Sequence, residues 1–385
     1  MEDWQHGGFG LYIHWPYCES KCPYCDFNSH VATSVNQVVW QKAFLSEIDR
    51  IGAQTRGRRL DTIFFGGGTP SLMNPDLVGA VIERAKKTWV MRNDPEITLE
   101  ANPGSIEAGR FKGYHDAGVT RISMGMQAMN DEDLRKLGRK HTALEARNAF
   151  EIARNCFERV SFDLIYARQD QTLAEWSTEL QMALKLSVDH LSLYQLTIED
   201  GTAFAERLAR GGLKGLPKDD VAADMYELTQ ELMGTAAMQA YEVSNHAKVG
   251  AECFHNMIYW RGGDYIGIGP GAHGRLTINQ TRWATEAPKS PEIWLQLVES
   301  EQSGELKREA LTKRDHSLEY LMMSLRLREG MSVERFNAIS PARLCVERVT
   351  YLTELNMLEA DKRMIRATTK GRLVLNSLIR ELADY

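Results

Sequence analysis

The sequence predicts an α/β protein whose first part consists of parallel βα units, arranged as a barrel or an open sheet, with a separate helical part at the C-terminus. From Phe9 to about residue 215, short runs rich in β-branched and aromatic residues alternate with longer amphipathic runs. Strict alternation of this kind is typical of parallel strands joined by helices. The chain is less regular up to about residue 305 and then changes to closely spaced helical patterns.

Six strands are predicted in the first part, and each is a short apolar run. They cover residues 10–15 (GLYIHW), 60–66 (LDTIFFG), 96–102 (EITLEAN), 120–126 (TRISMGM), 159–166 (RVSFDLIY) and 188–196 (VDHLSLYQL). Helices are predicted between them, as in residues 38–51, where Trp40, Phe44, Ile48 and Ile51 recur at helical spacing. Six units are fewer than a complete (β/α)8 barrel contains.

Three regions are predicted along the chain. Residues 1–215 hold the βα units, residues 216–305 extend them, and residues 306–385 form a C-terminal domain. In the last region, helices predicted at 317–327, 332–339 and 342–355 precede a hairpin at 357–368 and a helix at 372–384, an order typical of a winged-helix-like fold. Its basic and acidic residues nearly balance, which favours packing or partner docking over DNA recognition.

Composition excludes several classes of protein. The chain is 43% hydrophobic and 25% charged with a net charge of −6, so it offers no broad attraction to nucleic acid or to an anionic membrane. Its longest apolar runs have the length of strands, and its N-terminus lacks the pattern of a signal peptide. Six cysteines, three of them clustered, do not form a disulfide framework. We therefore expect a reducing, cytoplasmic location.

Polar residues capable of chemistry fall at or near the carboxyl ends of the predicted strands. In chain order they are Cys18, Cys22, Cys25, the run Gly66-Gly67-Gly68-Thr69-Pro70, Glu100, Gln127, Asp163, Tyr194 and Gln195. The carboxyl ends of parallel strands meet at one rim, where proteins of this class build their sites. The sequence therefore predicts one site assembled from distant segments.

The cysteines stand in the spacing C-x3-C-x2-C, which suits zinc or an iron–sulfur cluster. One alternative is structural zinc with His14 or His30 as the fourth ligand. The other is a [4Fe–4S] cluster with three cysteine ligands and one iron open to a small molecule. The position on a rim beside a glycine-rich loop favours the cluster.

The other rim residues predict contacts to a polar ligand. A glycine run after a buried strand lets a ligand approach the backbone and hydrogen-bond to it. Arg139, in LGRKHT, is a candidate for bidentate binding of a carboxylate, and a solvated helix-end charge is the alternative. Glu100, Gln127 and Asp163 can hydrogen-bond to an amine or to ribose hydroxyls. Asp163 lies in an apolar strand, where a carboxylate is costly unless it is paired or bound.

These motifs together resemble those of a known superfamily. C-x3-C-x2-C followed by an aromatic residue, GGGTP, LEANP, GMQ, LGRKHT and FDLIYARQDQT are similar to the radical S-adenosylmethionine (SAM) superfamily, in the branch that contains oxygen-independent coproporphyrinogen III oxidase. The resemblance runs from about Tyr12 to the C-terminus. It implies a partial (β/α)6 TIM-type barrel and a [4Fe–4S] cluster on Cys18, Cys22 and Cys25. It also implies that SAM chelates the open iron of this cluster. An electron from the reduced cluster then cleaves the sulfonium of SAM and gives a deoxyadenosyl radical.

The resemblance also implies which residues contact SAM. The family's positions fall on Tyr12, Tyr24, Gly67, Gly68, Thr69, Glu100, Gln127, Arg139 and Asp163. Tyr12 stands six residues before the first cysteine, as in the family, and Tyr24 takes the place of the aromatic residue before the last one.

Two features distinguish the chain from the oxidase. The oxidase has a further cysteine two residues beyond the third cluster cysteine, where this chain has Phe27. Residues 255–260, HNMIYW, resemble the HNxxYW motif of the superfamily's haem chaperones, and CPYCDFNSH and YEVSNHA are similar to that family too. This implies binding of haem and its delivery to haem-requiring acceptor proteins. His255 is then the leading axial ligand, Cys253 and His273 are rivals, and a hydrogen-bonded packing histidine is the alternative.

Three hypotheses for the function follow. The first is a haem chaperone, the second is a porphyrinogen-decarboxylating oxidase, and the third is a radical enzyme acting on another substrate. Phe27 and HNMIYW favour the first. The sequence leaves open the electron donor, the haem acceptor, covalent or coordinate attachment of haem, the oligomeric state and peripheral membrane association. It also leaves open whether SAM cleavage is catalytic or regulatory.

Overall fold

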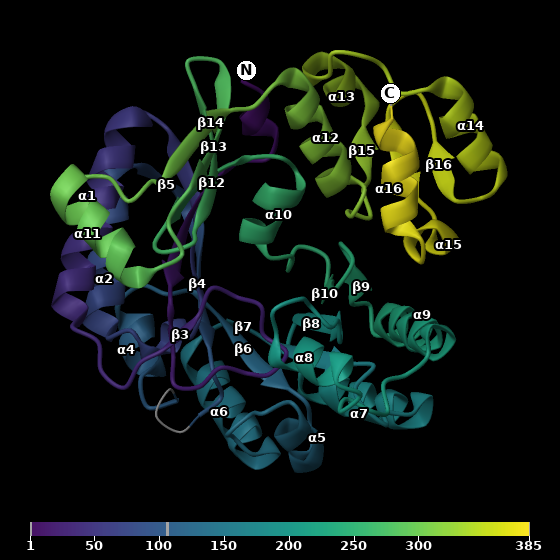
Figure 1. The fold of residues 1–385 in the computed structure, drawn as a ribbon, viewed down its shortest axis with the longest axis horizontal. Helices are drawn as coiled ribbons and strands as arrows, with labels where there is room; N and C mark the ends of the chain where they lie inside the picture. The colour runs from purple at the N-terminus through teal and green to yellow at the C-terminus, as the bar shows by residue number, and fades with distance from the viewer. Residues whose placement is uncertain (1, 105–107, 385) are drawn as a thin grey trace.

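A curved sheet of twelve strands forms the body of the molecule, and helices cover its outer face (Figure 1). The structure is a computed structural model that describes residues 2–104 and 108–384. The strand order is β14-β13-β12-β11-β1-β4-β5-β6-β7-β8-β10-β9. The seven central strands, from β11 to β8, run parallel, and antiparallel strands flank them.

All six predicted strands are confirmed, and they lie side by side in chain order. They are β1 (Phe9–Trp15), β4 (Arg59–Gly67), β5 (Val90–Ala101), β6 (Arg121–Gln127), β7 (Arg159–Tyr166) and β8 (His190–Gln195). The result is the partial (β/α)6 barrel that the family resemblance implied. Further strands extend the sheet beyond β1 on one side and beyond β8 on the other.

Helices follow these strands and cover the barrel. They are α1 (Gln37–Gln54), α2 (Pro75–Thr88), α4 (Phe111–Asp116), α5 (Asp131–Lys136), α6 (Ala143–Cys156) and α7 (Leu173–Leu186). Trp40, Phe44, Ile48 and Ile51 of α1 are all buried, as their spacing predicted. Capping boxes led by Thr142 and Thr172 begin α6 and α7, so these helices begin at sequence-defined positions.

The region after β8 is more regular than its sequence indicated. It contains α8 (Ala203–Ala209), α9 (Asp219–Thr235), β9 (Gln239–Ala240), β10 (Asn245–Ala247), α10 (Phe254–Trp260), β11 (Asp264–Ile268), β12 (His273–Ile278), β13 (Thr281–Glu286), α11 (Pro291–Glu301) and β14 (Lys307–Ala310). Strand β11 pairs with β1, with Gly267 opposite Tyr12. The sheet thus continues across residue 215, and the division at that point stays a prediction.

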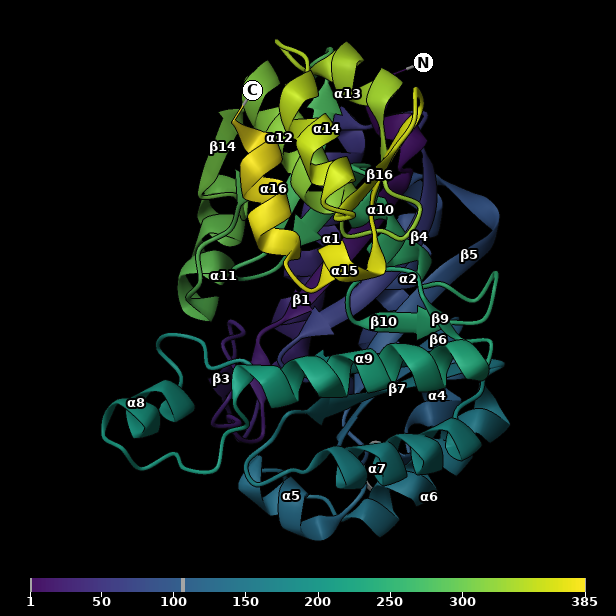
Figure 2. The same ribbon diagram turned by 90° about the vertical axis from the view of Figure 1, so that its right-hand side faces the viewer.

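The C-terminal part has its own hydrophobic core, which includes Leu321, Phe336, Leu352, Ile365 and Leu378. Its elements are α12 (Lys313–Ser324), β15 (Met331–Ser332), α13 (Val333–Ile339), α14 (Val346–Glu354), β16 (Leu358–Ala360), β17 (Met364–Ala367), α15 (Thr369–Arg372) and α16 (Leu375–Ala383). The predicted hairpin is confirmed, with β17 between β16 and β15. These helices pack together at one end of the molecule, away from α5, α6 and α7 (Figure 2).

The described residues also form the short elements η1 (Asp3–His6), β2 (Tyr17–Cys18), β3 (His30–Val31) and η2 (Pro70–Leu72). Asp3 of η1 forms an ion pair of 2.7 Å with Arg335 of α13, so the N-terminal turn is fastened to the C-terminal helices. Among the described residues, none of the helices is both long enough and apolar enough to cross a membrane.

Candidate functional site

A cavity of about 590 Å³ opens at the carboxyl ends of the barrel strands. Every predicted site residue except Tyr12 and His255 lines it: Cys18, Cys22, Tyr24, Cys25, Gly67, Gly68, Thr69, Glu100, Gln127, Arg139 and Asp163. Tyr194 and Gln195, which close β8, line it as well. The convergence of distant strand ends on one cavity is therefore confirmed.

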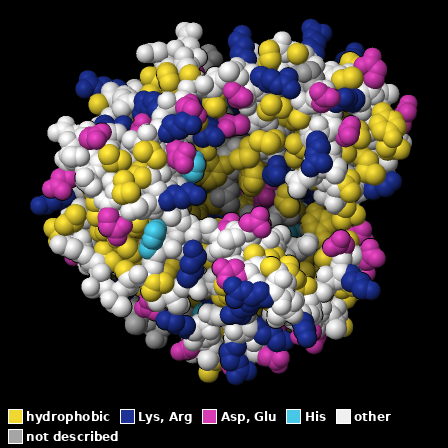
Figure 3. All heavy atoms as spheres, viewed as in Figure 1, with side chains coloured by type: hydrophobic (Ala, Val, Ile, Leu, Met, Phe, Trp, Pro, Cys, Tyr) yellow, Lys and Arg dark blue, Asp and Glu magenta, His cyan; other side chains and the backbone are white. Residues whose placement is uncertain are grey.

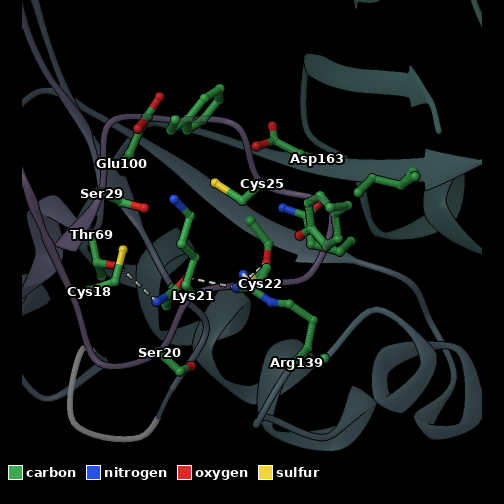
Figure 4. Close-up of a pocket in the computed structure, with 18 of the residues that line it drawn as sticks. Cys18, Ser20, Lys21, Cys22, Cys25, Ser29, Thr69, Glu100, Arg139 and Asp163 are labelled. Carbon is green, nitrogen blue, oxygen red and sulfur yellow. Dashed lines mark hydrogen bonds between the residues drawn. The ribbon is translucent and has the colours of Figure 1, made fainter. Parts of the chain in front are cut away.

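Cys18 ends β2, and Cys22 and Cys25 lie on the loop that follows it to β3; all three line this cavity (Figure 4). Cys18 is buried, and Cys22 and Cys25 are half-buried. The backbone N–H of Cys25 donates to the carbonyl of Cys22 over 3.1 Å, which makes a turn between these two. The hydroxyl of Thr69 donates to Sγ of Cys18 over 3.3 Å. Burial is the main cause that raises the thiol pKa of Cys18 and of Cys25.

The arrangement of these thiols fits a cluster better than a single zinc ion. Within residues 2–104 and 108–384, no three His, Cys, Asp or Glu side chains lie close enough together to hold one metal ion. His14 Nε2 instead lies 2.9 Å from the carbonyl of Asn28, and His30 Nε2 lies 3.3 Å from Oδ1 of Asn28. In a [4Fe–4S] cluster each thiolate binds a different iron, so the sulfur atoms need not surround one point.

Segments far away in the sequence hold the cysteine loop in place. Nδ2 of Asn28 donates to the carbonyl oxygens of Pro270 and Lys289, each over 2.9 Å. Gly138 has a φ of +70°, and a β-carbon there would lie 2.6 Å from the ring of Pro23. The loop therefore packs against the turn after α5 on one side, and on the other it is hydrogen-bonded to the segment after β11 and the segment after β13.

The glycine run has a packing role that the sequence analysis did not foresee. Gly67 has a φ of +110°, and a β-carbon there would lie 2.7 Å from the ring of His14; one at Gly68 would lie 2.7 Å from the carbonyl of Tyr17. The N–H groups of Gly68 and Thr69 already donate to the carbonyls of Trp15 and Tyr17. These two N–H groups therefore bind the β1–β2 segment, and ligand binding to the glycine run stays a prediction.

Glu100 and Asp163 are acidic groups on the inner side of the cavity (Figure 4). Burial, followed by the nearby charge of Asp163, raises the pKa of Glu100 to about 8. Burial also raises the pKa of Asp163 to about 6, although a hydrogen bond from Ser192 opposes the rise. Carboxyl groups in this state favour a ligand that brings positive charge or hydrogen-bond donors.

Arg139 lies within the site, so the alternative of a solvated helix-end charge is wrong. Its Nη1 lies 3.3 Å from Sγ of Cys22, and its Nη2 donates to Oδ1 of Asn102 over 2.6 Å and to the carbonyl of Gly125 over 3.1 Å. The sequence analysis missed Asn102, which also donates to the hydroxyl of Thr69. Its position directly after β5, in LEANP, was the available signal.

Gln127 ends β6 with a φ of 70°, in the left-handed region that a residue with a β-carbon rarely adopts. Such backbone strain persists where the surrounding structure requires it and is common at functional sites. Here it lies on the lining of the cavity.

Tyr12 lies outside the cavity lining, on the inner face of the barrel. Its hydroxyl is 3.0 Å from Nδ1 of His14, and its ring stacks on Phe64 and on His255 with centroid distances of 6.2 and 6.3 Å. Its assignment as a SAM contact stays a prediction.

His255 is buried in α10, with an exposed fraction of 1%. Its Nδ1 lies 2.7 Å from the hydroxyl of Thr62, and its Nε2 lies 2.6 Å from the hydroxyl of Tyr259. Burial lowers its pKa to about 3. This geometry matches the alternative of a packing histidine, and ligation of haem iron requires His255 to release at least one hydrogen bond.

The two rival haem ligands differ in exposure. Cys253 is buried, and its Sγ donates to Oε1 of Glu96 over 3.3 Å. Burial raises its pKa to about 12, so it is a thiol rather than the thiolate that binds iron. His273 begins β12 and is exposed.

Comparison with known proteins gives a consistent result over the whole chain. Residues 12–183 match the Radical SAM superfamily model, and residues 311–374 match the HemN C-terminal domain. Two proteins named heme chaperone HemW, from Haemophilus influenzae and Escherichia coli K12, are 38% and 39% identical, with 96% of this chain and 96% of each relative aligned. A bovine relative, radical S-adenosyl methionine domain-containing protein 1, mitochondrial, is 36% identical over 97% of this chain and 86% of its own length.

One solved structure shares the fold along almost the entire chain. It is coproporphyrinogen III oxidase (HemN) from Escherichia coli, with a TM-score of 0.81, covering 99% of this chain and 91% of that one. The sequence identity is 22%, so this likeness establishes the fold alone.

Proposed function

The chain belongs to the heme chaperone HemW family of the radical SAM superfamily, and from this premise we propose that it binds haem and delivers it to haem-requiring proteins. The observation that carries the proposal is the 38–39% identity, over nearly the full length, to two relatives named heme chaperones. Phe27, at the position of the oxidase's additional cysteine, supports it as well. The likeness to the oxidase rests on a shared fold and does not favour the oxidase hypothesis.

Membership of the superfamily implies a [4Fe–4S] cluster and SAM, and we assign both to the cavity at the strand ends. Cys18, Cys22 and Cys25 are the proposed cluster ligands, since three thiols of one loop face the same cavity. Bound there and reduced, such a cluster would supply the electron for cleavage of the sulfonium of SAM.

The chain's own residues have distinct tasks in this arrangement. Glu100 and Asp163 accept hydrogen bonds from ammonium or ribose hydroxyl groups, which lowers the cost of their charged forms. Arg139, fixed by Asn102 and Gly125, orients a carboxylate next to Cys22. The hydroxyl of Thr69 donates to Cys18 and stabilises its thiolate.

We further propose haem-requiring acceptor proteins and an electron donor as partners, in a reducing, cytoplasmic compartment. All six cysteines are free thiols, which suits such a compartment. The net charge of −6 gives no reason to add nucleic acid to these partners.

A paired assay on one anaerobically reconstituted sample tests the proposal. Haem transfer to an apo-haem protein and turnover of coproporphyrinogen are measured side by side, and we expect transfer without turnover. Turnover of coproporphyrinogen without haem transfer would favour the oxidase hypothesis over the chaperone hypothesis. Cys22→Ala protein, assayed in parallel, shows which of the two activities needs the cluster.

A further inference from the structure

Tyr259, in the HNMIYW helix, is more accessible than the histidine that begins this motif. His255 has an exposed fraction of 1%, whereas Tyr259 is half-buried. Both lie in α10, about one turn apart, and the hydroxyl of Tyr259 lies 2.6 Å from Nε2 of His255. The accessible member of the pair thus carries an oxygen atom that the buried imidazole holds in place.

The other ring nitrogen of His255 fixes the direction of this hydrogen bond. Nδ1 lies 2.7 Å from the hydroxyl of Thr62, a buried group that has no second hydrogen-bond partner among the described residues. If Nδ1 carried the proton, the hydroxyl proton of Thr62 would be buried without an acceptor, which costs free energy. Thr62 therefore donates to Nδ1, and Nε2–H of His255 donates to the oxygen of Tyr259.

This direction prepares the oxygen of Tyr259 to bind a cation. The oxygen accepts from His255, so its own proton is directed away from the imidazole. A hydrogen bond from an N–H group to an ionised oxygen is stronger than one to a neutral oxygen. His255 therefore favours the phenolate form of Tyr259 over the phenol form wherever a cation replaces the phenol proton.

Aromatic rings surround this pair on the inner face of the barrel. Tyr265 of β11 contacts Tyr259 edge-on with a centroid distance of 4.5 Å, and Tyr12 of β1 and Phe64 of β4 stack on His255 at 6.3 and 5.0 Å. Tyr12, Phe64 and Tyr265 are all half-buried. Helix α10 lies near the centre of Figure 1, where Figure 3 shows the surface hollowed, with hydrophobic side chains beside the hollow. Such surroundings suit a flat, apolar ligand.

We propose that Tyr259 is the axial ligand of ferric haem and that His255 positions its phenolate oxygen. The proposal rests on the haem-chaperone function and assigns the bond between its cargo and the protein. Tyrosine is one of the side chains that hold haem iron in proteins. His255 keeps both of its hydrogen bonds in this arrangement, whereas ligation by His255 itself would break at least one of them.

The ligand exchange needs no electron transfer. Burial raises the pKa of Tyr259, so the chain without haem holds the phenol. When ferric haem that carries hydroxide binds, the O–H bond of Tyr259 breaks, the iron–oxygen bond forms, and the hydroxide leaves as water with the phenol proton. The anionic oxygen then lies between the ferric iron and the N–H of His255, and both offset the cost of its charge.

Titration of ferric haem into the full chain tests the assignment. The Soret band and the charge-transfer band that a phenolate gives on ferric iron are followed together. Tyr259→Phe removes one oxygen atom and keeps the ring, and Tyr351→Phe, at an exposed tyrosine of α14, is the matched control. We expect Tyr259→Phe to lose the charge-transfer band and to bind haem roughly tenfold more weakly, and the control to behave as wild type.

The positioning role of His255 has a spectroscopic readout of its own. His255→Ala should keep the charge-transfer band but displace it, because the phenolate oxygen loses its N–H donor. His255→Gln, whose amide can donate in place of Nε2, should displace the band less. A band at the wild-type position in His255→Ala protein would overturn the positioning role.

Each other outcome has a definite meaning. A Tyr259→Phe variant that keeps the band and the affinity overturns the proposal, as does wild type that binds haem without any charge-transfer band, and both leave the chaperone function standing. Wild type that binds no haem overturns the proposed function itself. If Tyr259→Phe does not fold, resonance Raman spectra of haem-loaded wild type decide, because the absence of phenolate vibrations rejects Tyr259 as the ligand.

Discussion

The cavity at the strand ends and the surroundings of His255 are two polar regions built in opposite ways. In the cavity, Glu100 and Asp163 are held with raised pKa values, and Arg139 lies beside the cysteine loop. Around His255, both ring nitrogens are already hydrogen-bonded to protein hydroxyl groups. The difference teaches that the cavity is prepared for its ligand, whereas ligation at His255 requires the release of at least one of these hydrogen bonds.

The largest expected effect concerns the cysteines. Cys22→Ala should abolish the broad cluster absorbance and the bound iron of anaerobically reconstituted protein, because two thiolates and one SAM molecule leave the cluster short of a ligand. Cys345→Ala, which removes a half-buried thiol from the C-terminal domain, should keep both. Full iron content in Cys22→Ala protein would remove this loop from the cluster site.

The second prediction tests whether His255 is structural. His255→Ala leaves a cavity and removes the partner of both the Thr62 and the Tyr259 hydroxyl groups. We expect the free energy of unfolding, measured in urea without haem, to fall by about 3–5 kcal/mol. An unfolding free energy within 1 kcal/mol of wild type would deny the packing role.

Haem titration of the same variant sharpens the comparison. If His255 changes partners to bind iron, the Soret band of wild type and of His255→Ala should differ in position. Identical bands would leave His255 a packing residue only.

The third prediction concerns pH. The pKa of Glu100 is about 8 in the fold, against an ordinary value of 4.5. Between these pH values the folded state holds a proton that the unfolded state has released. Stability of the cluster-free chain should therefore decrease as pH rises from about 4.5 to 8, and Glu100→Gln should reduce this decrease, with the part below about pH 6 that comes from Asp163 remaining. At pH 8 the variant should be more stable by roughly 2–4 kcal/mol, while it binds SAM more weakly.

Urea unfolding at pH 5 and at pH 8 measures this effect. Glu381→Gln, which alters an exposed carboxylate of α16, is the matched control and should follow wild type at both pH values. If the unfolding free energy of Glu100→Gln and that of wild type change equally between pH 5 and pH 8, burial does not raise the pKa of Glu100.

The smallest expected effect is that of Arg139→Gln. Loss of one charged contact to a carboxylate should weaken SAM binding about tenfold, measured by calorimetry, with iron content unchanged. If Arg139→Gln and wild type bind SAM with equal affinity, Arg139 does not bind the carboxylate of SAM. If the variant loses iron, the contact of Arg139 with Cys22 supports the cluster instead.

The barrel and the rim could be predicted from sequence because both depend on local patterns. The six strands are short apolar runs between helices, and residues at strand ends converge by the geometry of parallel sheets. Strand β11 escaped prediction because DYIGI is short and contains glycine, and it becomes a strand only by pairing with β1.

The details that the sequence does not reveal depend on contacts between distant segments. The spacing of Tyr12 from the cysteines does not reveal that its ring stacks on Phe64 and on His255, which also stack on each other. Similarly, GGGTP does not reveal that Gly68 lies against the carbonyl of Tyr17. Asn102 acquires its role only because Arg139, from another strand's loop, reaches it.

The two hydrogen bonds from Asn28 to Pro270 and Lys289 also bear on how the protein is made. Synthesis proceeds from the N-terminus, so the cysteines leave the ribosome long before the carbonyl groups that anchor their loop. Until then, Cys18, Cys22 and Cys25 belong to a segment without its final support. Cluster insertion into the finished geometry thus falls near the end of translation or after it, and the nascent thiols need protection from oxidation in the interval.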